Sequence, residues 1–194
     1  MIDTITTRLL TFSDIYPEML DSFKHKQIIF NKWVKSKDHY ELTKTNVVRE
    51  WSDDKKIWIS QYLYQQMNRG GFAAGAFFNN KIVGFSCLDG ILQGISEKYV
   101  NLTMLFVDDE WQRKGIGKKL FHQMCLCADD MKADKIFISA IPSYETVAFY
   151  FNMGCSDARY IIDSFVDAEN DRYLEYDLKR NQLLSYSIKI GEIR

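Results

Sequence analysis

A short glycine-containing turn between a predicted strand and a predicted helix most constrains this chain. Residues Leu105–Lys118 read LFVDDEWQRKGIGK: an apolar run ends at Val107, an acidic turn follows, and a helix begins near Gly115. The first N–H groups of a helix lack partners within it, and together with the helix dipole they attract anions. Glycine lets a phosphate approach the backbone closely. The segment predicts either an anion site or an ordinary turn with solvated lysines.

Length and composition favour a single domain with a sizeable core. The chain has 194 residues, of which 46% are hydrophobic and 14% aromatic, and only two are proline. The formal net charge of −1 argues against a protein that coats nucleic acid or an anionic membrane. We find neither an apolar run as long as a membrane span nor the pattern of a secretion signal. We therefore expect a cytoplasmic protein.

The cysteines predict reduced core thiols, not a metal site or disulfides. They lie in apolar segments without metal-ligand spacing. We expect no bound metal. The four residues are Cys87, Cys125, Cys127 and Cys155.

Hydrophobic periodicity predicts a mixed sheet with helices on both faces. A hairpin is expected from Phe72–Phe78 and Lys81–Leu88, because Asn79 and Asn80 tolerate positive φ. Residues 25–50 have poor periodicity, and we assign no element to them. The other expected elements are the strands Thr6–Thr11, Tyr99–Val107, Lys135–Ile141, Cys155–Phe165 and Tyr173–Leu178, and the helices Ile15–Lys24, Asp53–Asn68, Gly115–Met131 and Ser143–Asn152.

The C-terminal tail carries a weaker strand pattern. Residues 184–190 alternate apolar and polar side chains, which is typical of a strand with one buried face. Such a strand would pair with the sheet edge of this chain or of a second subunit. A homodimer formed through the tail is therefore a hypothesis.

Two motifs resemble the GCN5-related N-acetyltransferase (GNAT) superfamily. The family signature Gln/Arg-x-x-Gly-x-Gly/Ala stands here as Gln112–Gly117 (QRKGIG). The later family helix reads Asn-x-x-Ala-hydrophobic-x-Phe-Tyr and soon reaches Gly-Phe; here Ser143–Tyr150 reads SYETVAFY, and Gly154-Cys155 follows. The resemblance covers about residues 72–178 and is closest to uncharacterised bacterial members. Residues 1–70 match only loosely.

The resemblance implies a fold and a cofactor. The implied fold is a mostly antiparallel sheet of about seven strands, whose central parallel pair splays between the strand ending at Val107 and the strand Lys135–Ile141. The pantetheine arm of acetyl-CoA would lie in the gap like an added strand, and its pyrophosphate would lie on backbone N–H groups after it. The implied cofactor-binding residues are Leu105, Phe106, Val107, Gln112, Arg113, Lys114, Gly115, Ile116, Gly117, Lys118, Ser143, Thr146 and Tyr150.

Tyr150 is the predicted general acid. A departing CoA thiolate needs a proton or a hydrogen bond, and a phenol can supply either. Ser143, Thr146 and Tyr150 are three and four residues apart, so they share one face of a helix. Ser143 replaces the usual Asn of the family and is expected to hold the pantetheine less well than an amide does. The alternative is a core tyrosine beside Phe149 and Phe151.

The general base is less visible than the acid. Many family members place a glutamate on or near the strand before the signature, but Tyr99–Val107 contains no carboxylate. Glu97 precedes this strand and is the candidate base, with Asp89 as its alternative, acting directly or through water. Both also fit the description of solvated loop carboxylates. Weaker candidates are His25, His39 and His122.

The predicted function is acetyl transfer from acetyl-CoA to a primary amine on a small molecule or a peptide. Direct attack in a ternary complex is expected, because neither motif contains a cysteine that would carry the acyl group. We divide the domain into an acceptor side (1–70), an acetyl-CoA core (71–178) and a tail (179–194). Aromatic residues of the acceptor side would stack on a ligand or belong to the core: Phe23, Phe30, Trp33, Tyr40 and Trp51.

Two other functions remain open. A non-catalytic acetyl-CoA sensor or partner-binding module is the alternative, because the strand carboxylate is absent and Ser143 replaces Asn. A nucleotide-binding module is disfavoured, since the chain has neither Gly-x-Gly-x-x-Gly nor a Gly-rich loop ending in Gly-Lys-Ser/Thr.

Overall fold

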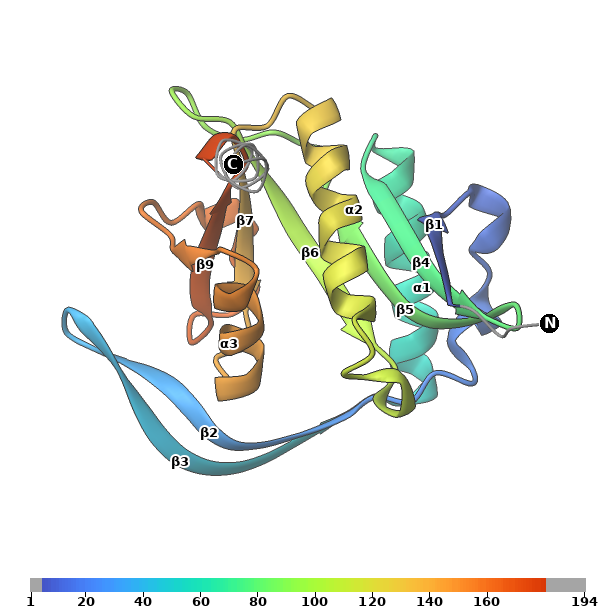
Figure 1. The fold of residues 1–194 in the computed structure, drawn as a ribbon, viewed down its shortest axis with the longest axis horizontal. Coiled ribbons are helices and arrows are strands. Elements are labelled where there is room, and N and C mark those ends of the chain that lie inside the picture. The colour runs from blue at the N-terminus through green and yellow to red at the C-terminus, as the bar shows by residue number, and fades with distance from the viewer. Residues whose placement is uncertain (1–4, 181–194) are drawn as a thin grey trace, which may run out of the picture.

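The computed structural model describes residues 5–180 (Figure 1). The predicted strand at 184–190 lies outside the described residues. Short 3₁₀ turns occur at Phe12–Asp14, Pro17–Leu20, Asp109–Trp111 and Asp163–Phe165. The strands and helices, in chain order, are β1 (Thr6–Leu9), β2 (Lys26–Ser36), β3 (His39–Glu50), α1 (Asp53–Asn68), β4 (Phe72–Phe78), β5 (Lys81–Leu88), β6 (Tyr99–Val107), α2 (Ile116–Asp130), β7 (Lys135–Ala140), α3 (Tyr144–Asn152), β8 (Ser156–Asp157) and β9 (Arg172–Asp177).

Elements with strong local boundary signals occur where the sequence predicts them. Helix α1 begins after Ser52, whose hydroxyl accepts a hydrogen bond from the Lys55 N–H at 3.2 Å. The turn between β4 and β5 holds Asn79 and Asn80 at φ 48° and 61°, as expected for a tight hairpin. The predicted helix at Ser143–Asn152 is also confirmed, with Ser143 as its N-cap residue.

Two predicted elements are wrong. The helix predicted over Ile15–Lys24 contains only the short 3₁₀ turn Pro17–Leu20, because Tyr16 precedes a proline and is extended (φ −142°, ψ 159°). The strand predicted over Cys155–Phe165 shrinks to Ser156–Asp157. Its later apolar residues Ile162 and Phe165 leave the sheet edge and pack on the buried Tyr99 and Phe137 instead.

Residues 25–50, to which no element was assigned, form a long hairpin of β2 and β3. The strands pair from Lys26 with Glu50 to Ser36 with His39. Aromatic and β-branched residues on both sides of Ser36–Asp38 were the available signal. Figure 1 shows the hairpin running along one end of the sheet, from the α1 side to the α3 side.

The main sheet has seven strands in the order β1-β4-β5-β6-β7-β9-β8, and only β6 and β7 are parallel. The predicted mixed, mostly antiparallel sheet is therefore confirmed. The parallel pair is joined only from Tyr99–Asn101 to Lys135–Phe137, and the strands then diverge as predicted (Figure 1). The divergence begins beside a register shift in which Leu88 pairs with Leu102 and Cys87 with Met104. The extra residue, Thr103, is a bulge of the kind that bends a strand.

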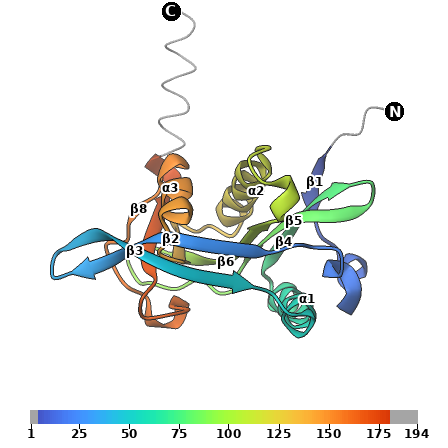
Figure 2. The same ribbon diagram turned by 90° about the horizontal axis from the view of Figure 1, so that it is seen from below.

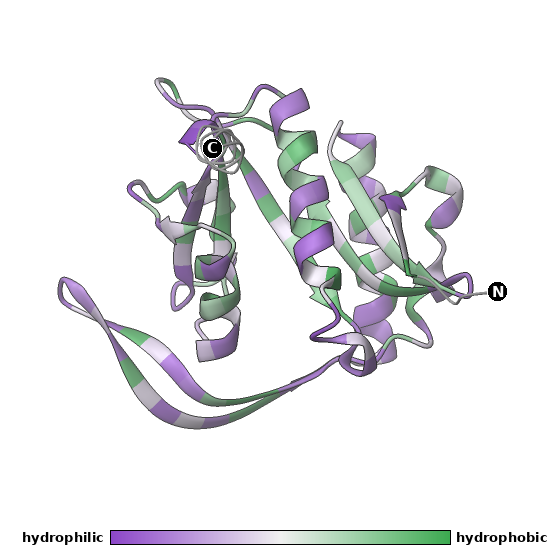
Figure 3. Ribbon diagram, in the orientation of Figure 1, coloured by the Kyte–Doolittle hydropathy of each residue, from purple (hydrophilic) through white to green (hydrophobic). Residues whose placement is uncertain are grey.

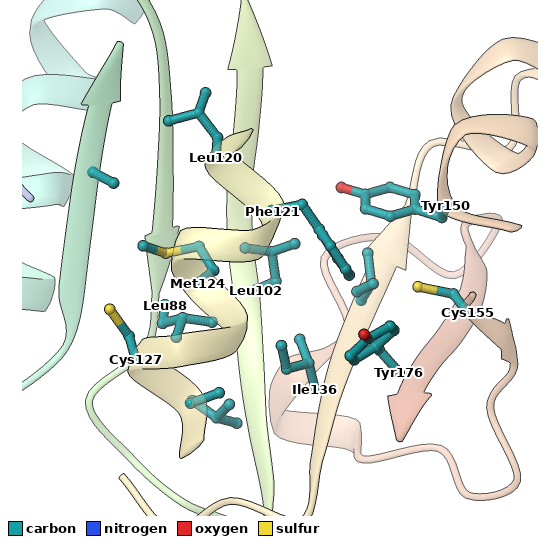
Figure 4. Packing of buried hydrophobic residues seen from close by; sticks show 14 of the residues in the cluster. Leu88, Leu102, Leu120, Phe121, Met124, Cys127, Ile136, Tyr150, Cys155 and Tyr176 are labelled. Atoms are coloured by element: carbon teal, nitrogen blue, oxygen red, sulfur yellow. The ribbon is translucent and has the colours of Figure 1, made fainter. Parts of the chain in front are cut away.

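Helices cover both faces of the sheet. Figure 2 shows α2 and α3 on one face and α1 on the other. Under α2, the fully buried Leu120, Phe121 and Met124 pack against Leu88 and Ile136 (Figure 4). The outward side of α2 is polar, so hydrophilic and hydrophobic bands alternate along it in Figure 3.

The four cysteines are free thiols, as predicted, and three of them are buried. In residues 5–180, no group of three or more His, Cys, Asp or Glu side chains is placed to hold a metal ion. None of the helices in this range is both long and apolar enough to cross a membrane.

Candidate active site

A cavity of about 1390 Å³ lies where β6 and β7 diverge. Residues 102–107 of β6 and residues 138–141, at the end of β7, form its walls. Gly117 and Tyr150 line it from the face that carries α2 and α3, whereas Trp58 and Tyr62 line it from the α1 face. The cavity therefore passes through the sheet, and the two faces offer it different chemistry.

The N-terminus of α2 opens into this cavity. Its N-cap residue is Gly115 at φ 78°, which contributes no side-chain cap, and Arg113 also has positive φ. The helical bonds begin with the Lys119 N–H donating to the Gly115 carbonyl at 3.1 Å, so the N–H groups of Ile116–Lys118 have no acceptor within the helix. A Cβ built on Gly115 meets nothing within 4 Å. Open space, free N–H groups and nearby cations together suit a diphosphate.

Most of the predicted cofactor-binding residues line the cavity, but Lys114 does not. Its ammonium lies 4.4 Å from the centre of the Trp111 ring. Gln112 lines the cavity and donates a 3.0 Å hydrogen bond to Asp109, which holds the turn before α2. The predicted residues that do line the cavity are Leu105, Phe106, Val107, Gln112, Arg113, Gly115, Ile116, Gly117, Lys118, Thr146 and Tyr150.

Tyr150 lies on the cavity wall with its ring nearly buried, 7% exposed. Figure 4 shows the phenol reaching from α3 toward α2, with its oxygen on the side of Leu120 and Phe121. The ring centre lies 6.1 Å from that of Phe121 and 5.1 Å from that of Phe149, both edge to face. Burial raises the pKa of the Tyr150 hydroxyl above its usual range, so the phenol keeps its proton near neutral pH.

Ser143 is fully buried and does not line the cavity. Its hydroxyl accepts from the Thr146 N–H at 3.1 Å and lies 2.9 Å from the Thr146 hydroxyl. It also accepts from the Gln27 amide of β2 at 3.1 Å. The expectation that Ser143 binds pantetheine is not supported, because the hydroxyl caps α3 and anchors the hairpin.

Glu97 lies outside the cavity, at the opposite end of β6. Its carboxylate forms a 3.0 Å ion pair with Lys135, which a second carboxylate, Glu175, also contacts at 3.0 Å. The neighbouring Tyr99 and the cavity residue Val107 are about 26 Å apart along the strand. The structure therefore gives Glu97 an ion-pairing role and does not support it as the base. The alternative base, Asp89, accepts from the Ile91 N–H and is also outside the cavity lining.

A substitution at Glu97 tests this correction. We expect Glu97→Gln to keep kcat/KM for acetyl transfer within about twofold of the parent value, because it changes no group in the cavity. Steady-state assays of both proteins measure the ratio. A fall of tenfold or more would return Glu97 to the list of candidate bases.

Of the three candidate histidines, only His25 lines the cavity. Its ring centre lies 4.2 Å from that of Trp51 and 5.2 Å from that of Phe106. Burial lowers the pKa of His25, so the ring is neutral near pH 7. Among the described residues, Nδ1 of this ring has no hydrogen-bond partner. The unpartnered nitrogen is itself buried, and burial disfavours the protonated ring, so His25 is a weak proton acceptor.

The aromatic residues expected to stack on a ligand or belong to the core lie in three different places. Phe30 and Trp51 line the cavity, whereas Phe23 is in the core, stacked on Trp51. Trp33 and Tyr40 of the hairpin lie 4.9 and 4.0 Å from the Arg172 guanidinium. That cation ties the hairpin to β9, on the far side of the cavity.

Sequence analysis missed the charged and aromatic residues on the α1 side of the cavity. Helical spacing places Lys55, Trp58, Ile59 and Tyr62 on one face of α1, which was a usable signal. The carboxylates opposite them had none, because they belong to an irregular loop after residue 165. The missed cavity residues include Arg49, Lys55, Trp58, Tyr62, Thr103, Ser139, Asp167 and Asp171.

Comparisons with known proteins agree with this geometry. The profile of the acetyltransferase (GNAT) family matches residues 33–154, which is more than half of the chain. This family match identifies the chain as an acyltransferase that uses acetyl-CoA. The chain belongs to the acetyltransferase (GNAT) family. No curated protein matches the sequence significantly.

Solved structures of acetyltransferases share the fold. A GNAT-family acetyltransferase from Staphylococcus aureus Mu50 is 21% identical, with a TM-score of 0.62 over 90% of this chain and 99% of the other. A putative streptothricin acetyltransferase from Bacillus anthracis str. Ames, solved with acetyl coenzyme A, is 18% identical (TM-score 0.61, coverage 90% and 99%). AtaT in complex with acetyl-methionyl-tRNAfMet is 16% identical (TM-score 0.59, coverage 93% and 99%).

Proposed function

We propose that this acetyltransferase moves the acetyl group of acetyl-CoA to a primary amine by direct attack in a ternary complex. The observation that carries the proposal is a single cavity that joins the uncapped N-terminus of α2, the diverging strand β6 and the buried phenol of Tyr150. The α2 face suits the coenzyme, and the α1 face leaves room for an acceptor.

The chemistry assigned to each group follows from its place. Acetyl-CoA supplies an activated thioester. The ammonium of the acceptor first loses a proton to water in the open cavity or to His25. The amine nitrogen then bonds to the acetyl carbon as the carbon–sulfur bond breaks, and the Tyr150 hydroxyl gives a proton or a hydrogen bond to the leaving sulfur.

A covalent route through cysteine has no support among the cavity residues. None of the four cysteines lines the cavity. Burial raises the pKa of Cys155, the one nearest α3 in sequence, far above its usual range, so its thiol stays protonated and poorly nucleophilic. Direct attack needs no such residue.

An amine panel tests the proposal. We expect thiol release from acetyl-CoA to depend on at least one primary amine among small amines, amino acids, peptides and aminoacylated tRNA. The last class belongs in the panel because the AtaT structure contains an acetylated methionyl-tRNA. The mass of the accepting amine should increase by that of one acetyl group in place of a hydrogen. Coenzyme binding without amine-dependent release from any member would contradict amine transfer and favour the sensor alternative.

A further inference from the structure

The α1-side half of the cavity carries charges of both signs. Arg49 from the end of β3 and Lys55 from the first turn of α1 line one wall. Asp167 and Asp171 line the other, from the loop between Phe165 and β9. In the described part of the chain, none of the four forms an ion pair. Groups of opposite charge that face one cavity without pairing leave room for a ligand that matches both.

The carboxylate wall is held by β7. The Ser139 hydroxyl donates to the Asp171 carboxylate at 2.8 Å and accepts from the Asp167 N–H at 3.1 Å. Burial away from solvent raises the pKa of both Asp167 and Asp171. The negative charge of Asp171 raises the pKa of Asp167 further. A bound ammonium would relieve this cost, because a nearby cation favours both ionised carboxylates.

The cationic wall is backed by an aromatic ring. The Lys55 ammonium lies 3.5 Å from the centre of the Trp58 ring, in a cation–π contact. Partial burial, and then the charge of Arg49, lowers the pKa of Lys55. An anionic ligand group beside Arg49 and Lys55 would offset their mutual repulsion.

Two large aromatic side chains of the cavity lining are accessible. Trp58 is 45% exposed and Phe30 is 59% exposed, and both line the cavity. Exposed aromatic surface in a cavity commonly marks the place where the apolar part of a ligand packs. The pocket thus provides two carboxylates, two cations and an apolar surface.

Building on the proposed function, we infer that the acceptor is a zwitterionic amine of amino-acid type: its ammonium lies against Asp167 and Asp171, its carboxylate faces Arg49 and Lys55, and its side chain packs on Trp58 and Phe30. A simple polyamine would satisfy the carboxylates but would bring no anion to Arg49 and Lys55, whose charges would repel it.

Matched pairs of acceptors test the inference on the full chain. We would measure kcat/KM by thiol release for phenylalanine against phenethylamine, tyrosine against tyramine, lysine against cadaverine and ornithine against putrescine. The members of each pair differ only in the carboxylate. In at least one pair, kcat/KM for the amino acid should exceed kcat/KM for the matched amine by tenfold or more, because the amine leaves both cations without an anionic partner. Ratios near or below one in every pair would overturn the inference.

Two variants and a control test which residues cause the preference for the amino acid over the amine. Arg49→Gln should lower kcat/KM for the preferred amino acid by tenfold or more without lowering that of the matched amine, so the ratio of the two values should fall toward one. Asp167→Asn should lower both. Lys44→Gln removes a cation of the same hairpin that does not line the cavity, and it should preserve the ratio. An equal ratio in the Arg49 variant and the parent would contradict the assignment.

The panel also separates this inference from the proposed function. Turnover of decarboxylated amines or peptides with no preference for amino acids would overturn the zwitterion inference and leave amine transfer standing. Absence of amine-dependent release from every acceptor would overturn both.

Discussion

Tyr150→Phe should lower kcat about 100-fold, which is at the lower end of what a positioned general acid contributes. Loss of the hydroxyl removes the group that we propose protonates the leaving sulfur, but keeps the ring against Phe121 and Phe149. KM for acetyl-CoA should change little, because the substitution removes a contact that matters as the carbon–sulfur bond breaks. Steady-state kinetics at several pH values, with acetyl-CoA varied, measures both constants.

The control for this variant lies on the same helix. Tyr144 is 49% exposed and does not line the cavity, so Tyr144→Phe should have the kcat of the parent. Both variants should melt within a few degrees of it, since neither empties a packed volume. A Tyr150→Phe protein with the parental kcat across the pH range would show that the phenol is a core residue without an acid role.

Gly117→Glu should raise the Kd for acetyl-CoA by about 100-fold or more. The new carboxylate stands in the first turn of α2, where the diphosphate is proposed to bind, and like charges in contact cost several kcal/mol; a loss of 2.8 kcal/mol corresponds to about 100-fold. The Cβ would also lie 3.3 Å from the Phe149 ring, which must shift slightly to admit it. Titration calorimetry with acetyl-CoA gives the Kd.

The fold should survive this substitution. Glutamate in the first turn of a helix is favourable, because its charge complements the dipole, and it replaces a poor helix former. Lys119→Glu is the matched control: it adds a carboxylate to the same helix at an exposed residue outside the cavity lining. That variant should change the Kd by less than about threefold, since solvent and salt screen an exposed charge. Normal affinity in Gly117→Glu would place the diphosphate elsewhere.

Local sequence patterns predicted correctly those elements whose boundaries are specified within one short segment. The boundaries of α1 and of strands β4 to β6 follow from a capping serine, an Asn-Asn turn and runs of apolar residues. The N-terminus of α2 was recognisable for the same reason: Gly115 is needed at positive φ, and the N–H groups that follow are a property of the helix itself.

Local sequence patterns did not predict features that depend on contacts between distant segments. The helix predicted at Ile15–Lys24 is wrong for a separate, local reason, which is that Tyr16 precedes a proline. The β2–β3 hairpin was missed because its strands are stabilised by anchors far away in sequence, such as the Trp33 N–H donating to the Pro142 carbonyl at 2.7 Å. Spacing alone placed Ser143 on the cofactor face, but the partner that occupies its hydroxyl is Gln27 of that hairpin.

The amino-acid sequence by itself determined the proposed coenzyme side of the cavity, because a helix N-terminus, its glycines and a phenol on the next helix are local features that a few residues specify. Only the tertiary structure brought together the pocket that we propose for the acceptor. Arg49, Lys55, Asp167 and Asp171 come from three separate segments and form one pocket only after β6 bends away from β7. The same fold places Glu97 before the start of β6, whereas the cavity lies at the other end of this strand. Residues close to a motif in sequence can therefore lie far from it along an extended strand.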